Sequence, residues 1–410
     1  MEFNTKLLHG ITSKGYEKGE ILPPISQVSA FQYEKMEDLE RVFAHKSNGF
    51  AYSRIGNPTL NSFEQRVNEL EGGAGAVCTS SGMSAIAVAL LAVCNSGDEI
   101  ITSSALYGGT INLFGDLNKL GIKTVFVDDF TEDNLKEAIT YKTRVIYGEL
   151  ISNPALKVMD VPKVSSIAHE AGIPLFVDST MATPFIARPL SLGADVVIHS
   201  TSKYINGGGN SIGGIIVDGG RFPWDFEKYT ALSEFKKYGK FAFMVRLRTD
   251  LWENIGGCMA PMNAFLSYIG LDTLGIRMER ICDNAKALAN ALSTLSGVEV
   301  SYLTLSDHPY HEYVDKELNG YGGGVLSFRV GSKERAFRVI DSLKYSIIAS
   351  NIGDLRTLVI HPASTLYSKT RREDREAAGV FDDTIRVSMG IENIHDLIED
   401  FVNAINESAN

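Results

Sequence analysis

The chain has 410 residues, and a single hydrophobic core rarely supports a chain of this length, so we expect two folded domains. Its 44% hydrophobic and 22% charged residues are typical of a soluble globular protein, and the net charge of -11 argues against nucleic acid as the main partner. No apolar run is long enough to span a membrane, and the N-terminal stretch lacks the apolar core of a signal peptide. We therefore expect a cytoplasmic protein with no membrane partner.

The first predicted segment, residues 1–55, is an extended N-terminal arm. It contains Pro23-Pro24 and little periodicity, so it buries little of its own surface and is expected to pack on a neighbouring subunit.

Residues 56–256 are predicted to form an α/β domain. Short β-branched apolar runs alternate with helical periodicity, which indicates a mainly parallel sheet covered by helices on both faces. The predicted strands are 98–103, 123–128, 144–150, 174–178, 195–199 and 212–217, and the predicted helices are 84–93, 132–139 and 161–171.

Residues 257–410 are predicted to form a smaller α+β domain, with helices on one side of a mixed sheet. The predicted helices are 261–296, which a break could divide, 333–343 and 393–407, and the predicted strands are 298–303, 324–330, 357–360 and 384–388. The four cysteines form no CxxC pair and lie in apolar surroundings, so we expect reduced core thiols and no metal site. They are Cys78, Cys94, Cys258 and Cys282.

The stretch 79–84, "TSSGMS", precedes a predicted helix. The backbone N–H groups of Gly82 and Met83 would lie at the positive end of the helix dipole, which suits a phosphate. A simple cap by Ser80 or Ser81 explains the same pattern, and both interpretations stay open.

Other phosphate fingerprints are absent from the sequence. No G-x-x-x-x-G-K-[ST] occurs, and no G-x-G-x-x-G follows a predicted strand. P-loop NTPases and nicotinamide-dependent dehydrogenases are therefore disfavoured.

Polar side chains also end two of the predicted strands. Asp178 closes one of them, where a carboxylate is costly unless a cation meets it, and Ser200, Ser202 and Lys203 follow the other. Lys203 could be a surface loop residue, a counter-charge to phosphate or a Schiff-base nucleophile. The combination fits pyridoxal 5'-phosphate, with Asp178 on the protonated ring nitrogen and the serines on the phosphate.

These residues lie within "DSTMATPFIARPLSLGADVVIHSTSKYINGGGNSIGG" (178–214), which resembles the signature of the Cys/Met-metabolism pyridoxal-phosphate enzymes, a family of fold type I. Further matching motifs are "AYSRIGNPT" (51–59), "TSSGMSAI" (79–86), "LYGGT" (106–110), "GELISNP" (148–154), "NIGDLRTLVIHPAST" (351–365) and "IRVSMGIE" (385–392). The resemblance extends over nearly the whole chain and implies a fold-type-I transferase.

The resemblance implies a role for each matching position. Lys203 would be the Schiff-base lysine, and Tyr107 would stack on the cofactor ring and take part in proton transfer. The other expected cofactor contacts are Gly82, Met83, Asp178, Thr180, Ser200 and Ser202, with Tyr52 and Arg54 supplied by the neighbouring subunit; the expected substrate contacts are Arg386, Asn153 and Asn351.

Taken without the resemblance, three of these residues have plainer explanations. Arg386 suits a substrate carboxylate but could form a strand-edge salt bridge. Tyr52 could be a buried aromatic residue and Asn153 a turn residue before Pro154. Two positions depart from the family pattern, because Gly208 and Tyr367 stand where relatives commonly have histidine.

Among the family members, the sequence "LYGGTINLF" (106–114) is most similar to that of the O-acetylhomoserine sulfhydrylases, whereas methionine γ-lyases typically carry cysteine at the position of Gly109. The expected reaction is γ-replacement on O-acetyl-L-homoserine with sulfide or a thiol, in methionine biosynthesis. Methionine or cystathionine γ-lyase activity is the alternative.

Two other classes of protein are disfavoured. A class I aldolase would have no use for Asp178, and a binding protein that merely keeps the fold would not need Lys203. The resemblance also implies at least a homodimer, with a homotetramer as the usual assembly.

Overall fold

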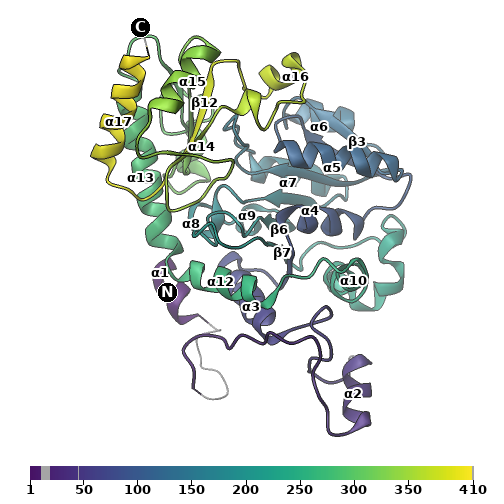
Figure 1. Ribbon diagram of the computed structural model, residues 1–410. Coiled ribbons are helices and arrows are strands. Elements are labelled where there is room, and N and C mark those ends of the chain that lie inside the picture. The colour runs from purple at the N-terminus through teal and green to yellow at the C-terminus, as the bar shows by residue number, and fades with distance from the viewer. Residues whose placement is uncertain (11–18, 45, 409–410) are drawn as a thin grey trace.

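The computed structural model describes residues 1–10, 19–44 and 46–408, and its largest element is a sheet of seven strands (Figure 1). The strands are β1 (Gly75–Thr79), β2 (Glu99–Ser103), β3 (Lys123–Val127), β4 (Thr143–Glu149), β5 (Leu175–Asp178), β6 (Val196–His199) and β7 (Gly214–Asp218). Their order is β1-β7-β6-β5-β4-β2-β3, and β7 runs in the direction opposite to the other strands. The predicted mainly parallel sheet is confirmed.

Helices cover the large sheet. Strands β2, β6 and β7 are buried along their whole length, as expected for strands covered on both faces. The helices of this part are α3 (Pro58–Glu71), α4 (Gly82–Leu91), α5 (Gly108–Lys119), α6 (Glu132–Ala138), α7 (Val161–Glu170), α8 (Thr183–Ile186) and α9 (Pro189–Leu192). Strand β1 and helices α3 and α5 were not predicted from the sequence.

A second sheet, of five strands, lies in the C-terminal part. Its strands are β8 (Glu299–Ser301), β9 (Val325–Arg329), β10 (Ile347–Ile348), β11 (Leu358–Ile360) and β12 (Thr384–Ser388), in the order β10-β11-β12-β9-β8. Helices α13 (Leu274–Leu292), α15 (Lys333–Ser342) and α17 (Ile394–Glu407) border this sheet in Figure 1. The remaining helices here are α12 (Pro261–Asp272), α14 (Glu312–Lys316) and α16 (Arg372–Ala377).

The helix predicted over 261–296 has the break that its sequence allowed, at Thr273 between α12 and α13. One predicted boundary needs correction, because the strand predicted over 212–217 starts two residues later, at Gly214. The segment between the two sheets also contains helical turns that lacked a clear periodic signal. They are a 3-10 segment (Thr230–Phe241), α10 (Ala242–Arg246), a π-helical turn (Leu247–Trp252) and α11 (Glu253–Ile255).

The N-terminal arm is not wholly extended. It contains α1 (Phe3–His9), which buries Leu7 and contacts α3, α12 and α13, and α2 (Met36–Phe43), which buries no residue. Helices of seven and eight residues are too short to give a clear periodic signal. Residues 11–18 and 45 of the predicted arm lie outside the described residues. Figure 1 shows the segment with α2 projecting from the body of the molecule.

The core under the large sheet includes a cluster of aromatic rings around Phe243. This side chain is fully buried, and its ring centroid lies 5.5 Å from that of Phe176 and 5.7 Å from that of Trp224. We expect Phe243→Ala to lower the free energy of unfolding by about 3–5 kcal/mol, because it leaves a cavity that the rigid sheet cannot fill. Chemical denaturation measures the change. The exposed Tyr141→Ala is the control and should change stability by less than about 0.5 kcal/mol; equal losses in both variants would contradict the prediction.

The cysteines are free thiols, and Cys78, Cys94 and Cys282 are buried. Burial raises the pKa of the Cys94 and Cys282 thiols well above the usual range, which makes them poor nucleophiles. None of the helices in the described ranges has the length and apolar character needed to span a membrane.

Candidate active site

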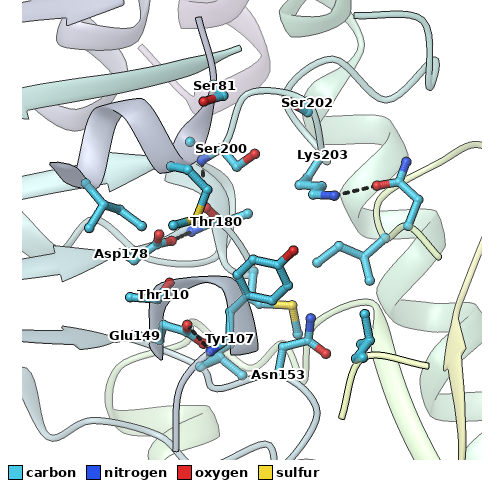
Figure 2. Close-up of a pocket in the computed structure, with 18 of the residues that line it drawn as sticks. Ser81, Tyr107, Thr110, Glu149, Asn153, Asp178, Thr180, Ser200, Ser202 and Lys203 are labelled. Carbon is cyan, nitrogen blue, oxygen red and sulfur yellow. Dashed lines mark hydrogen bonds between the residues drawn. The ribbon is translucent and has the colours of Figure 1, made fainter. Parts of the chain in front are cut away.

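A pocket of about 190 Å³ lies at the edge of the large sheet where strands β4, β5 and β6 end, facing the small sheet. Parallel strands bring their carboxyl ends to one edge, which is where ligands bind in such sheets. The predicted residues that line the pocket are Gly82, Met83, Tyr107, Asn153, Asp178, Thr180, Ser200, Ser202, Lys203, Asn351 and Arg386. Figure 2 shows Ser81, Ser200 and Ser202 toward one side of it, with the ring of Tyr107 between Asp178 and Lys203 in that view.

On the serine side of the pocket, the N-terminus of α4 lies close to Ser200, and the two meet at Gly82. Ser81 caps α4 by accepting a hydrogen bond from the Ser84 N–H at 3.1 Å, so the predicted cap exists. The cap leaves other N–H groups of the first turn without an intrahelical partner. Glycine is required at position 82, because a Cβ there would lie 2.7 Å from the Cβ of Ser200. A helix cap and a cradle for an anion therefore coexist here.

Asp178, which is half-buried, ends β5 with a carboxylate. Its Oδ1 accepts a hydrogen bond from the Thr180 N–H at 2.9 Å, and burial raises the pKa of the carboxyl. Thr180 in turn accepts a hydrogen bond from the Ser200 N–H at 2.7 Å, which ties the ends of two strands together. A cation beside Asp178 would offset the cost of ionising it.

A second carboxyl, Glu149, lies in the same pocket and was not predicted from the sequence. It is the register partner of Asp178 across β4 and β5, and it accepts a hydrogen bond from the Tyr107 N–H at 2.7 Å. Burial and, to a lesser extent, the charge of Asp178 raise the pKa of Glu149 to about 8. The reasoning that identified Asp178, a carboxylate at a strand end, would have found Glu149 within "GELISNP".

The raised pKa of Glu149 predicts a pH effect on the stability of the protein without cofactor. The unfolded chain loses this proton near its ordinary pKa of 4.5, whereas the folded chain keeps it up to about 8. Between these values the folded state holds more protons, so Glu149 makes stability fall as the pH rises. Glu149→Gln should remove this contribution, and denaturation at several pH values should show its stability advantage growing from pH 5 to 8. An advantage independent of pH would contradict the assignment.

Lys203 directs its amine into the pocket and is not a surface loop residue. Its Nζ donates a hydrogen bond to Asn351 Oδ1 at 2.6 Å. Burial and, to a lesser extent, the charge of Arg386 lower the pKa of the amine to about 8. A larger fraction of the amine is therefore neutral, and nucleophilic, near neutral pH than for an ordinary lysine.

Arg386 is a buried cation on β12, a central strand of the small sheet, so the alternative of a strand-edge salt bridge does not hold. Its Nη1 donates to Asn153 Oδ1 at 3.3 Å and its Nη2 donates to the Asn351 carbonyl at 2.9 Å. Its buried Nε has no hydrogen-bond partner among the residues that the structure describes. Burial lowers the pKa of the guanidinium to about 10. A buried guanidinium with uncharged partners in a pocket is suited to bind an anion.

Of the remaining predicted residues, Tyr107 lines the pocket, whereas Tyr52 and Arg54 lie outside it. Tyr107 precedes α5 and stays 42% exposed, which leaves its ring available to a ligand. Tyr52 is 43% exposed and is not a buried aromatic residue; it and Arg54 do not line the pocket. Of the two departures from the family pattern, Tyr367 is buried and donates to the Asn153 carbonyl at 3.4 Å, whereas Gly208 does not line the pocket.

The groups present fit pyridoxal 5'-phosphate. Its phosphate suits the turn at Gly82, where a Cβ would collide with Ser200, its ring nitrogen suits the carboxylate of Asp178, and its aldehyde suits the amine of Lys203. The orphaned Nε of Arg386 leaves a place for the carboxylate of an amino acid in the same pocket.

The comparisons with known proteins agree with this chemistry. Residues 4–406 match the family described as Cys/Met metabolism PLP-dependent enzyme. The chain is 38% identical to an O-acetyl-L-homoserine sulfhydrylase of Corynebacterium glutamicum, over 97% of this chain and 95% of the relative, and 37% identical to an L-methionine gamma-lyase of Fusobacterium nucleatum, over 97% and 96%.

A solved structure has the same fold over almost the whole chain. It is described as an O-acetylhomoserine (thiol)-lyase from Campylobacter jejuni and contains N'-pyridoxyl-lysine-5'-monophosphate. Its TM-score is 0.94 at 33% identity, and the match covers 99% of this chain and all of that one. The chain belongs to the Cys/Met-metabolism family of enzymes that depend on pyridoxal 5'-phosphate.

Proposed function

We propose that the protein catalyses γ-replacement on O-acetyl-L-homoserine, with sulfide or a thiol as the sulfur donor, to give L-homocysteine and acetate in methionine biosynthesis. The observation that carries the reaction type is that one pocket contains both the nucleophilic Lys203 and the guanidinium of Arg386, which has no charged partner. The leaving group and the sulfur donor are supported by the likeness to sulfhydrylases over nearly the full chain.

Several residues of the pocket then have a role in holding the cofactor. Gly82, Met83, Ser200 and Ser202 would hold the phosphate, Asp178 would pair with the ring nitrogen, and Lys203 would form the covalent link. Thr180 orients Asp178 through the hydrogen bond to its carboxylate. When bound, the cofactor supplies an electron-accepting ring that stabilises negative charge on substrate carbon atoms.

The side chains of the protein do the rest of the chemistry. Arg386 binds the substrate carboxylate in a bidentate manner, and Asn153 and Asn351 fix the guanidinium that does so. With the substrate in place, the amine of Lys203 would take the α-proton at Nζ and serve the later proton transfers, with Tyr107 assisting. The Cγ–O bond breaks as acetate leaves, and hydrosulfide forms the new Cγ–S bond.

The alternative reaction is elimination to 2-ketobutyrate and ammonia, since a γ-lyase is also among the relatives. Gly109 supports replacement, because methionine γ-lyases typically carry cysteine at this position. A Cβ at this position would lie 2.5 Å from Cε1 of Tyr107, so cysteine there would require the Tyr107 ring to move. The ring orientation seen in this chain is one that glycine permits.

The test of the proposed function is to supply O-acetyl-L-homoserine to the holoenzyme with and without sulfide. We expect homocysteine and acetate in equal amounts when sulfide is present. 2-Ketobutyrate with sulfide present, and no homocysteine, would establish the lyase reaction instead. O-succinyl-L-homoserine under the same conditions tests the choice of leaving group.

We also propose that the enzyme is cytoplasmic and assembles at least as a homodimer, with a homotetramer as the expected state. The support is that Tyr52 and Arg54 are exposed outside the pocket of their own chain, where a neighbouring subunit could receive them at its phosphate site. Sedimentation measures the assembly. Mixing Arg54→Ala chains with Lys203→Ala chains should restore part of the activity if sites are shared between subunits, and no restoration would refute the shared site.

A further inference from the structure

Asn351 contacts both cationic side chains of the pocket. Its side-chain oxygen accepts the hydrogen bond from Lys203 Nζ at 2.6 Å, drawn as the dashed line from Lys203 in Figure 2, and its backbone carbonyl accepts from Arg386 Nη2 at 2.9 Å. We propose that Asn351 is a positioning residue that holds the amine of Lys203 whenever this amine is not bonded to the cofactor.

The chemistry of the contact suits a lysine that must repeatedly gain and lose a proton. Among the described residues, Asn351 is the side chain that accepts a hydrogen bond from Lys203 Nζ. The pocket is also lined by the acidic and basic side chains Glu149, Asp178 and Arg386, but Lys203 donates no hydrogen bond to either carboxyl group. A carboxylate in contact with the ammonium would stabilise its charge and keep the amine protonated. A neutral amide oxygen fixes the position of the amine and leaves it able to act as a base.

The surroundings of Asn351 fix its own position. Its backbone N–H donates to the Ala349 carbonyl at 3.0 Å, and the following turn is tied to β12 by the hydrogen bond from Gly353 N–H to Ser388 Oγ at 3.0 Å. Because Arg386 holds the backbone of the same residue, the resting place of the amine lies next to the site for the substrate carboxylate. The released amine would then wait near the substrate Cα.

The decisive experiment measures the pKa of the Lys203 amine in the full chain after the cofactor is removed. Potassium cyanate carbamylates neutral amines, and mass spectrometry of the peptide containing Lys203 gives the rate at each pH. We expect Asn351→Ala to lower this pKa by about one, because the ammonium loses its acceptor, and Asn351→Asp to raise it by at least as much.

The opposite signs separate positioning from a structural role, since a general disturbance of the loop would move both variants in the same direction. The matched control is Ser350→Ala, the neighbouring pocket residue, which should leave the pKa unchanged. Reconstituting an untreated sample of each variant with cofactor verifies folding. No change in Asn351→Ala, or changes of the same sign in the two variants, would overturn the inference.

A second readout uses the holoenzyme with L-norvaline, which has no leaving group, in deuterium oxide. We expect Asn351→Ala to exchange the α-hydrogen about tenfold more slowly at saturating amino acid, with KM little changed. Asn351→Asp should also be slow but recover at high pH, and an unchanged exchange rate in both variants would contradict the role. This inference rests on the lysine chemistry of the proposed function and not on its leaving group, so a failure to form homocysteine would refute the proposed reaction and leave the result for Asn351 standing.

Discussion

Replacing Lys203 by alanine is expected to lower the rate of homocysteine formation by about four orders of magnitude or more. The variant loses both the covalent link to the cofactor and the base that takes the α-proton, and a positioned base alone contributes about two to four orders of magnitude. Its amine lies in the pocket with a pKa of about 8, which suits both tasks. Steady-state kinetics measures the loss, and borohydride reduction followed by peptide mass spectrometry should find pyridoxyl-lysine in the native chain at Lys203.

The control for this prediction is Lys236→Ala, which removes an exposed lysine outside the pocket. It should keep the native rate and the label at Lys203. A Lys203→Ala chain that still forms homocysteine within tenfold of the native rate, or a label found on another lysine, would show that the covalent site has been misassigned.

Replacing Arg386 by methionine is expected to lower kcat/KM for O-acetyl-L-homoserine by about two to three orders of magnitude, mainly through a higher KM. Within the described part of the chain the buried guanidinium has no charged partner and an orphaned Nε, so a substrate carboxylate would meet a cation that is already desolvated. Losing one member of such a buried charge pair typically costs about 2–5 kcal/mol. Kinetics over a wide range of substrate concentration separates KM from kcat.

The cofactor contacts lie elsewhere in the pocket, so the visible absorbance of Arg386→Met should match that of the native holoenzyme. Arg386→Lys keeps the charge but not the planar fork and should recover only part of the loss. The surface variant Arg372→Met, whose side chain is 70% exposed, should behave as the native enzyme. A fall in kcat at unchanged KM would place Arg386 in the chemical step and not in carboxylate binding.

Part of the fold and of the site followed from the sequence alone. Alternating apolar strands and helices predict a parallel sheet, and Asp178, Ser200 and Lys203 each follow or close an apolar strand. Parallel strands end at one edge, so residues at the ends of β5 and β6 had to lie close together. The order of the motifs gave the expected roles of the remaining residues through the family resemblance.

The elements missed have weak local signals. Helix α5 begins with Gly108-Gly109, which are poor helix formers, and β1, "GAVCT", begins with glycine and alanine, which have low strand propensity. Both elements are held by tertiary packing: β1 pairs with β7, and α5 packs on α4 and β3. Packing overrode propensity in these places.

The sequence by itself indicated a mainly parallel sheet and the strand ends that carry Asp178 and Lys203, because both depend on periodicity and residue type within about ten positions, and the expected role of Lys203 came from the family resemblance. Only the tertiary structure brought Asn351 to within 2.6 Å of Lys203, although 148 residues separate them, and left Arg386 buried with no charged partner beside them. The physical reason is that the two sheets meet at the pocket, so contacts across it depend on how the sheets pack and not on any local pattern.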